Sequence, residues 1–265
     1  MSFNRKVLVV AVVILMLAAT GCADTVVKEE FYQSYQVRSG TVVNVINPNG
    51  SVTITGWDED TVEIRAVKES PRGQEALDEV DINIDIADEL LIETIHPTDN
   101  FLVSVSYDIK VPVDLLIDII ECANGNITLE NIGGNPDLST SNGTISAVNV
   151  NGIVSAVSSN GDITVTGVRS LDEVRTSNGN ITAELLAIFD NLEIKTSNGS
   201  IVLLLSPALA VDLDAKTSNG SISISNLNVD AAEFDQTTLS GSMNGGGHKI
   251  EISTSNGSIE LAQLK

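Results

Sequence analysis

The sequence predicts an all-β protein wound into a single-chain β-solenoid, or β-helix, with coils of about 18–21 residues after a β-rich N-terminal cap region. Three observations support this prediction. An Asn-Gly pair recurs at nearly constant spacing, residues at fixed distances from that pair share one chemical character, and apolar and polar residues alternate before the first pair. Hydrophobic residues make up 42% of the chain but aromatic residues only 3%, so the core is expected to be aliphatic.

The recurring Asn-Gly pair, usually preceded by Thr-Ser, sets the period of the repeat. Asn-Gly is a strong turn signal because both residues accept positive φ at little cost, so each pair predicts a tight corner between two strands. The asparagines are separated by 18, 18, 18, 20, 21 and 37 residues, and they are Asn124, Asn142, Asn160, Asn178, Asn198, Asn219 and Asn256. The last interval is expected to contain a degenerate coil at residues 238–243, so that eight coils stack in sequence order.

Residues at fixed distances from the asparagine predict ladders through the core. Three positions after it come Ile127, Ile145, Ile163, Ile181, Ile201, Ile222, Met243 and Ile259. Two positions before it come Cys122, Thr140, Ser158, Thr176, Thr196, Thr217, Thr238 and Thr254. Because the phase is the same in every coil, stacking places like residues above one another and mostly inside. Cys122 is therefore expected to be a buried core thiol.

Charged residues predict two further columns on the outer surface. Five positions before the asparagine come Asp137, Glu173, Glu193, Asp214, Asp235 and Glu251, and three positions before it come Arg175, Lys195 and Lys216. Stacked like charges repel, and an adjacent column of the opposite sign offsets that repulsion. We expect a charge-paired outer face. If the solenoid binds a partner there, the candidate residues are Glu173, Arg175, Glu193, Lys195, Asp214 and Lys216.

The N-terminal segment carries features of an export signal. Arg5 and Lys6 precede thirteen uninterrupted apolar residues at 7–19, which is too short for a comfortable membrane span and suits a signal peptide. The segment ends in Ala19-Thr20-Gly21-Cys22, which resembles a lipoprotein signal box. Plain secretion and an uncleaved anchor are the alternatives. A diacylglyceryl Cys22 would hold the protein to the membrane on the outer side, in the cell envelope.

The sequence therefore divides into four parts. Residues 1–21 are expected to be the signal peptide, 22–36 the lipidated cysteine and a tether, 37–120 the β-rich cap or first part of the solenoid, and 121–265 the Asn-Gly solenoid. Residues 80–86 alternate strictly between apolar and polar, and 90–95 are their expected partner strand. A meander or sandwich of the same hairpins is the alternative architecture, which the fixed phase of the repeat disfavours.

Composition and motifs exclude several functions. A net charge of −22, from 14 basic and 36 acidic residues, opposes phosphate binding, and few aromatic rings are available to stack on bases, so no nucleic acid is expected. No phosphate-binding or dinucleotide glycine motif occurs. His96 and His248 have no further histidine or cysteine at metal-ligand spacing. We expect no catalytic residue, no cofactor and no metal ion.

Residues 37–67, the approach Tyr107-Asp108-Ile109-Lys110-Val111-Pro112 and the run of Asn-Gly units resemble a bacterial and archaeal β-strand-repeat family of adhesin-like proteins of unknown function. The similarity covers residues 37–265. The resemblance implies a lipid-anchored or secreted envelope protein with a β-solenoid fold. It carries over no catalytic residue.

These expectations combine into a non-enzymatic, surface-exposed lipoprotein whose solenoid presents a binding or structural face, in contact with a cell-surface glycan or a protein. A polysaccharide-active β-helix enzyme is the main alternative, since the fold alone allows it. Such an enzyme needs several carboxylates converging on one face, whereas the outer charges here are regularly spaced. An accessory or sensor protein for envelope stress is the other alternative.

Overall fold

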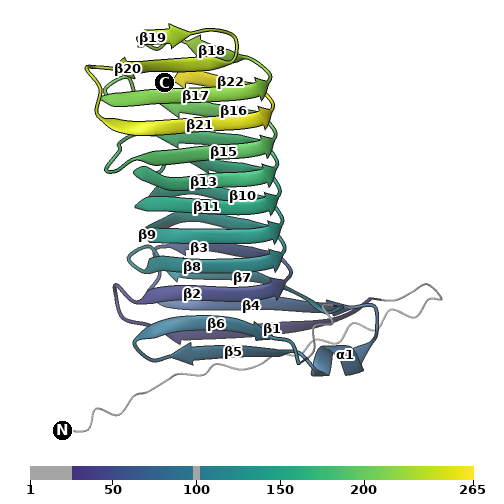
Figure 1. Cartoon of the computed structure of the whole chain (residues 1–265). Helices are drawn as coiled ribbons and strands as arrows, with labels where there is room; N and C mark the ends of the chain where they lie inside the picture. The colour runs from purple at the N-terminus through teal and green to yellow at the C-terminus, as the bar shows by residue number, and fades with distance from the viewer. Residues whose placement is uncertain (1–25, 98–101) are drawn as a thin grey trace.

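The computed structural model describes residues 26–97 and 102–265, which form a flattened solenoid of stacked strands with one short helix, α1 (Gln74–Asp78) (Figure 1). Strand pairings arrange the strands in two stacked layers, which we call the front and the back sheet. β9 (Ile127–Asn142) runs through both sheets and joins them. The prediction of an all-β solenoid is confirmed.

The front sheet contains twelve strands in spatial order. They are β5 (Asp81–Ile86), β6 (Glu89–Ile95), β2 (Val42–Asn49), β8 (Leu116–Asn124), β9, β11 (Ile153–Asn160), β13 (Ser170–Asn178), β15 (Leu192–Asn198), β21 (His248–Asn256), β17 (Val211–Asn219), β20 (Thr238–Met243) and β19 (Asp230–Phe234).

The back sheet completes each coil. Its strands, in spatial order, are β1 (Val27–Gln36), β4 (Thr61–Ser70), β7 (Ser104–Pro112), β3 (Val52–Trp57), β9, β10 (Ile145–Asn151), β12 (Ile163–Thr166), β14 (Ile181–Leu185), β16 (Ile201–Leu205), β22 (Ile259–Gln263) and β18 (Ile222–Ser225). Neighbouring coils pair in parallel, whereas β1, β4 and β5 at one end and β19 and β20 at the other pair antiparallel.

The coils do not stack in sequence order, and this corrects the expected arrangement. The last coil, β21–β22, lies between β15–β16 and β17–β18. Residues 238–243 are not a degenerate coil, because β20 runs antiparallel to β17 and pairs Thr238 with Lys216. Every coil presents the same register at its edges, so Asn256 pairs equally with Asn198 and Asn219. The positions of residues relative to the repeat asparagine therefore define each coil, but they do not determine which coils lie beside it.

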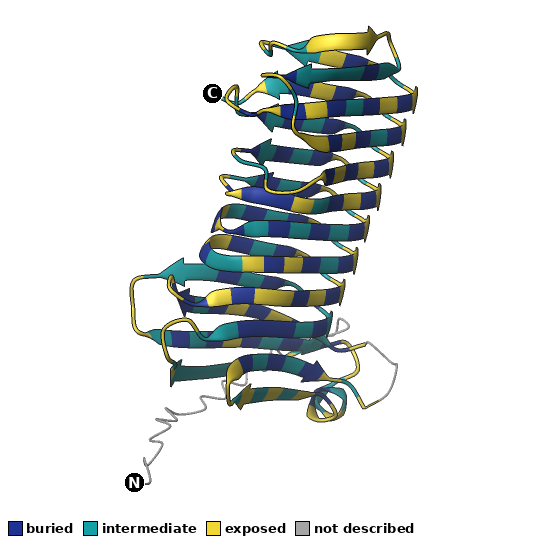
Figure 2. Ribbon diagram, turned by 60° about the vertical axis from the view of Figure 1, so that its left-hand side comes forward, coloured by how far each residue is buried: buried dark blue, intermediate teal, exposed yellow. Residues whose placement is uncertain are grey.

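Alternating burial along the strands forms the core between the two sheets (Figure 2). The isoleucines that follow the Asn-Gly corners are buried, from Ile127 at 0% exposure to Ile222 at 6%. Their burial follows from the strand period of two residues, which turns alternate side chains inward. Met243 is also buried, but on the antiparallel strand β20 rather than in a coil of the repeat.

The inward column of hydroxyls stabilises the corners. Thr140 Oγ1 donates to the carbonyl of Gly125 at 3.1 Å, one coil earlier, and Thr217 Oγ1 donates to Gly257 at 2.8 Å. The same bond is made by Ser158, Thr176, Thr196 and Thr254. Each bond satisfies a backbone carbonyl that strand pairing leaves open at the corner.

The Asn-Gly repeat was expected to supply residues that accept positive φ, and the structure shows a different physical reason for it. None of the seven repeat asparagines has positive φ; among the described residues other than glycine, positive φ occurs at Asn131, Asn149, Asn226 and Asn244. The repeat asparagines instead form a ladder. In each bond the side-chain amide donates to the asparagine of the adjacent coil on the side of the N-terminal end, from Asn142 to Asn124 through Asn219 to Asn256, at 2.9–3.0 Å. A Cβ on a corner glycine such as Gly143 would overlap the carbonyl oxygen of Gly125 in the adjacent coil. Glycine is required there by close stacking.

The predicted tether over residues 22–36 is wrong for most of its length. β1 begins at Val27 and pairs along ten residues with β4, with Phe31 opposite Ala66 and Tyr35 opposite Val62. These side chains are half-buried and pack against the core, which is why the segment is a strand and not a free linker. The predicted signal peptide and Cys22 lie outside the described residues. In the described part of the chain, no helix has the length and hydropathy needed to cross a membrane.

Candidate binding surface

The candidate binding residues lie on the outer surface of the front sheet, in its C-terminal half. Glu173 pairs in register with Glu193, Glu193 with Glu251, and Glu251 with Asp214. Glu251 thus lies between Glu193 and Asp214, which are closer to each other in the sequence than either is to Glu251. Asp235 does not belong to this acidic column, because its carboxylate accepts backbone N–H groups of Thr237 and Thr238 at 2.7 and 2.8 Å within its own turn.

Each basic residue of the column is paired with an acid on its own strand. Arg175 lies 3.6 Å from Glu173, Lys195 lies 3.8 Å from Glu193, and Lys216 lies 3.1 Å from Asp214. Residues two positions apart on a strand face the same side, so the pairs follow from the sequence spacing alone. The six side chains are 25–64% exposed, with Asp214 the least exposed, and such pairs contribute at most about 1 kcal/mol each. The result is a regular, charge-paired face.

Lys249 is a central residue of this surface that the sequence did not reveal. Its ammonium group lies 3.2 Å from Asp214 Oδ2 and 3.1 Å from Glu251 Oε2. The hydrogen bond to Glu251, followed by that to Asp214, raises the pKa of Lys249. Partial burial acts to raise the pKa of Asp214, but hydrogen bonds from Lys216 and Lys249 outweigh it and leave that pKa lowered.

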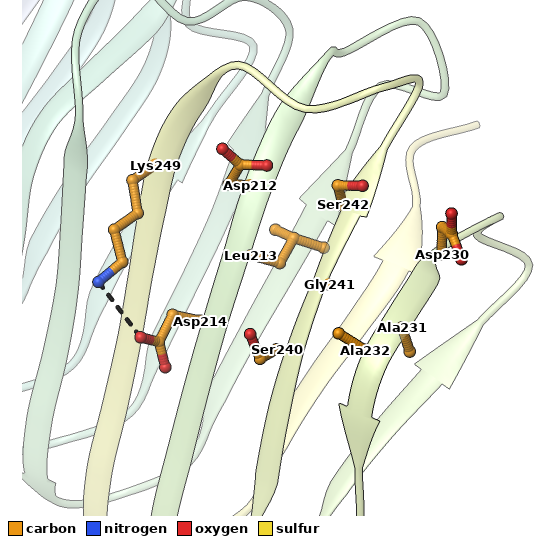
Figure 3. Close-up of a pocket in the computed structure, with 10 residues that line it drawn as sticks. All are labelled: Asp212, Leu213, Asp214, Asp230, Ala231, Ala232, Ser240, Gly241, Ser242 and Lys249. Carbon is orange, nitrogen blue, oxygen red and sulfur yellow. Dashed lines mark ion pairs between the residues drawn. The ribbon is translucent and has the colours of Figure 1, made fainter.

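A hollow of about 500 Å³ opens beside this ion-pair cluster, between β21, β17, β20 and β19 (Figure 3). Its polar lining consists of Asp212, Asp214, Asp230, Ser240, Ser242 and Lys249. Asp212 and Asp230 form no ion pair with any cation of the described residues, whereas the carboxylate of Asp214 meets Lys249 directly (Figure 3). Three carboxylates against one ammonium group leave the hollow with an excess of negative charge. Such a surface can hold a cationic or hydroxyl-rich group.

The hollow depends on the antiparallel cap. Asp230 lies on β19 and Ser240 on β20, both of which follow the coil that carries Asp212 and Asp214. Gly241 permits the close approach of β19, because a Cβ there would lie 2.8 Å from the carbonyl oxygen of Asp230. In the sequence, the signal for the residues around the hollow is the pair of acids at alternate positions on β17, Asp212 and Asp214. These two acids do not indicate which strands lie beside β17.

A second polar cluster lies on the outer back sheet at the opposite end. The guanidinium of Arg65 lies 5.2 Å from the ring centre of Tyr32, whose hydroxyl donates to Glu63 at 2.9 Å. The ammonium of Lys110 lies 5.2 Å from the ring centre of Trp57, whose indole N–H donates to the carbonyl of Thr61. Both rings are thus covered on one face by a cation of the same chain.

The buried thiol of Cys122 packs and hydrogen-bonds as part of the core. Cys122 is buried, its Sγ donates to the carbonyl of Gly50 at 3.1 Å, and burial raises its pKa to about 11. It continues the inward hydroxyl column, which extends beyond it to Asn47, paired with Cys122, and to Thr94, whose hydroxyl donates to Asn47 Oδ1 at 3.0 Å. Within residues 26–97 and 102–265, no group of three or more His, Cys, Asp or Glu residues is arranged to hold a metal ion.

Stacked parallel coils, a corner ladder of asparagines and antiparallel caps define a class of all-β solenoid proteins. The chain belongs to the Toastrack DUF4097 family, whose sequence pattern matches residues 47–262. The resemblance to β-strand-repeat proteins of unknown function is thereby confirmed.

Solved structures from several bacteria are similar to this chain at low sequence identity. They include a putative cell adhesion protein from Clostridium sporogenes (12% identity, TM-score 0.36, covering 89% of this chain and 100% of that chain) and a putative adhesin from Bacteroides fragilis (12%, 0.39, 89% and 97%). A putative lipid binding protein from Parabacteroides distasonis is also similar (13%, 0.35, 89% and 97%). No curated protein matches the sequence. At these TM-scores the structures carry no argument about function.

Proposed function

We propose that this chain is a non-enzymatic lipoprotein of the cell envelope, held to the membrane through Cys22, whose outer front sheet binds a partner on the extracytoplasmic side. The observation that carries the proposal is the regular face of same-strand ion pairs, which ends at the acidic hollow around Asp212 and Asp230. Repeated, exposed and individually weak pairs suit an extended binding surface. A catalytic centre would instead need charged groups that converge on one point.

The excess negative charge of the hollow indicates the chemistry of the partner. Complementary potential favours a cationic group, such as a protonated amine on a glycan or a basic side chain on a protein. Binding of amine-bearing, neutral and acidic glycans to the purified chain would test this. We expect Asp212→Asn together with Asp230→Asn to weaken binding of amine-bearing glycans severalfold, while Asp85→Asn at the other end of the front sheet leaves it unchanged. Equal loss in both variants would contradict the assignment of the hollow.

The same glycan panel tests the non-enzymatic part of the proposal. We expect no change in glycan length after long incubation with the purified chain. Bond cleavage that is abolished by Glu193→Gln would overturn the proposal in favour of a polysaccharide-active enzyme. Glu193 is the informative position because it stands in the middle of the acidic column, between Glu173 and Glu251.

The lipid anchor has a separate test. Cells that express the full chain are labelled with a radioactive or alkyne-bearing fatty acid, and the chain is isolated under denaturing conditions. Label in the unmodified chain and its loss in Cys22→Ala are expected. Cys122→Ala is the matched control and should keep the label, because Cys122 is a buried thiol.

A further inference from the structure

The N-terminal end of the solenoid leaves more apolar surface uncovered than the C-terminal end does. Half-buried hydrophobic side chains at the N-terminal end are Val27, Phe31, Tyr35, Val37, Ala76, Ile82, Ile84 and Ile86, whereas the C-terminal end contributes Ile224, Leu227 and Val229, together with Phe234, which is 52% exposed on β19. Val26 and Ile95, 48% and 43% exposed, add to the N-terminal set. An apolar excess at one end of a solenoid indicates a contact surface.

The excess arises because the outermost strands at this end have inward-facing side chains with no further coil above them. β5 alternates exposed positions with the inward isoleucines Ile82, Ile84 and Ile86, and among the described residues its only partner strand is β6. In the same part of the chain, β1 pairs only with β4. The helix α1 covers part of this end through Leu77, which is fully buried, but it spans only five residues (Figure 1).

The position of β1 limits how far this end can stand from a lipid attached at Cys22. Only residues 23–26 separate Cys22 from the first residue of β1. A fully extended chain covers at most about 3.5 Å per residue, so the five steps from Cys22 to Val27 span no more than about 18 Å. A tether of this length would hold the N-terminal end next to the bilayer.

We infer that the N-terminal end of the solenoid, formed by the outer edges of β1 and β5, rests on the lipid surface to which Cys22 is attached. This inference rests on the lipid anchor of the proposed function. The contact lies in the hydrated headgroup layer, because the free backbone groups of two edge strands cannot be left unsatisfied in hydrocarbon. Phe31 and Tyr35 are of the residue types that suit this interfacial layer.

Charge selects the kind of lipid surface. Asp81 and Asp85 are exposed on β5 and Glu30 is exposed on β1, whereas the exposed Lys28 of β1 is paired with Glu69 at 2.6 Å. Carboxylates close to anionic headgroups repel them within a Debye length of about 8–10 Å, so a zwitterionic surface is favoured. The binding hollow lies near the other end of the front sheet. Eleven strand spacings of about 4.8 Å separate β5 from β19, which places the hollow on the order of 50 Å from the membrane when the solenoid stands on this end.

The test compares two matched positions at opposite ends of the front sheet. Asn83→Cys on β5 and Ala232→Cys on β19 are both exposed sites on outermost strands. A thiol-reactive fluorophore is attached to each variant of the full chain, purified with its lipid. Cys122 is buried with a raised pKa and should not react. The labelled chains are then incorporated into phosphatidylcholine vesicles containing a spin-labelled lipid quencher.

We expect quenching at residue 83 to exceed that at residue 232 at least threefold, and to fall when the vesicles contain anionic phosphatidylglycerol at low salt. Fatty-acid label on the chain with equal quenching at both positions would overturn this inference and leave the anchor intact. A chain without fatty-acid label would remove both the anchor and the inference. Ile84→Ser and Ile224→Ser form a second matched pair, and only Ile84→Ser should lower the quenching at residue 83.

Discussion

Each end of the solenoid contains one coil that lies out of sequence order, and the two ends differ in whether that coil comes before or after its neighbours in the sequence. At the N-terminal end, the coil β2–β3 lies between β6–β7 and β8–β9, and it precedes both neighbours in the sequence. At the C-terminal end, the coil β21–β22 lies between β15–β16 and β17–β18, and it follows both. The first arrangement can grow outward from an early coil, whereas the second requires a late coil to enter between two earlier ones.

This difference has a consequence for folding and local stability. In a solenoid each coil contacts only its neighbours, so stability is divided among the interfaces between them. The C-terminal interfaces form only after the last residues of the chain arrive. We therefore expect the part from Val211 onward to open independently, while residues 42–205 behave as the stable body of the protein.

The largest expected effect is a charge placed inside either out-of-order coil. Val45 and Ile252 are 0% and 1% exposed in the equivalent inward column. A carboxylate there costs several kcal/mol because it is buried without a partner. Val45→Asp should abolish cooperative thermal unfolding, whereas Ile252→Asp should keep it and expose only residues 211–263 to rapid hydrogen exchange. Complete loss of protection in both variants would remove the distinction between the ends.

A methyl group on a corner glycine tests the interfaces on which the two out-of-order coils depend. In Gly125→Ala the new Cβ would overlap the carbonyl oxygen of Gly50, and in Gly220→Ala it would overlap that of Gly257. Backbone cannot move aside as a side chain can, so each change should cost about 3 kcal/mol or more. Gly133→Ala is the control, since its nearest atom would be 3.3 Å away.

The measurement for the glycine variants is chemical denaturation together with hydrogen exchange. Gly125→Ala should lower the free energy of global unfolding. Gly220→Ala should mainly speed exchange from residue 211 onward. If Gly133→Ala proved as damaging as the other two, close stacking would not be the reason for glycine at the corners.

Alkaline pH should destabilise the N-terminal half through the inward column. The pKa of Cys122 is raised from 9.0 to about 11 by burial, so the folded state favours the neutral thiol. The resulting stabilisation is complete below pH 9 and is lost as the pH rises towards 11; two pKa units correspond to roughly 2–3 kcal/mol. The threonines that hold this position in later coils do not ionise in this range.

Cys122→Ser isolates the effect, because serine does not ionise and can donate to the same carbonyl of Gly50. The variant should unfold at nearly constant denaturant concentration from pH 9 to 10, where the unmodified chain already loses stability. Above pH 10 both chains also lose the contribution of Tyr107, whose pKa burial raises from 10.0 to about 12. An unchanged alkaline profile in Cys122→Ser would contradict the assignment.

The smallest expected effect concerns the exposed charges of the C-terminal end. Lys249→Ala removes two ion pairs, to Asp214 and Glu251, whereas Lys216→Ala removes one. Both changes should lower the urea midpoint only slightly, and the loss should shrink at high salt. Because the pKa of Asp214 is lowered from 3.8, its contribution is present above that pH and is lost as the pH falls below it. A larger loss for Lys216→Ala than for Lys249→Ala in urea denaturation would argue against a bridging role for Lys249.

The ion pairs within one strand of the candidate surface were predictable from the sequence, whereas those between strands were not. Glu193 and Lys195 lie two positions apart on one strand, so local geometry alone brings them together. Lys249 and Asp214 lie on strands that meet only because the last coil enters between two earlier ones. No local pattern encodes that pairing, since all coils share the same register.

The sequence by itself determined the all-β solenoid, the inward ladders, the buried position of Cys122 and the same-strand ion pairs, because each follows from strand period and repeat phase. Only the tertiary structure decided that β1 replaces most of the expected tether, that residues 238–243 form a cap, and that the corner glycines serve close stacking. It also decided the order of the coils. Because every coil presents the same register at its edges, strand pairing alone does not choose which coils become neighbours. The caps and loops make that choice, and their packing depends on contacts between distant parts of the chain.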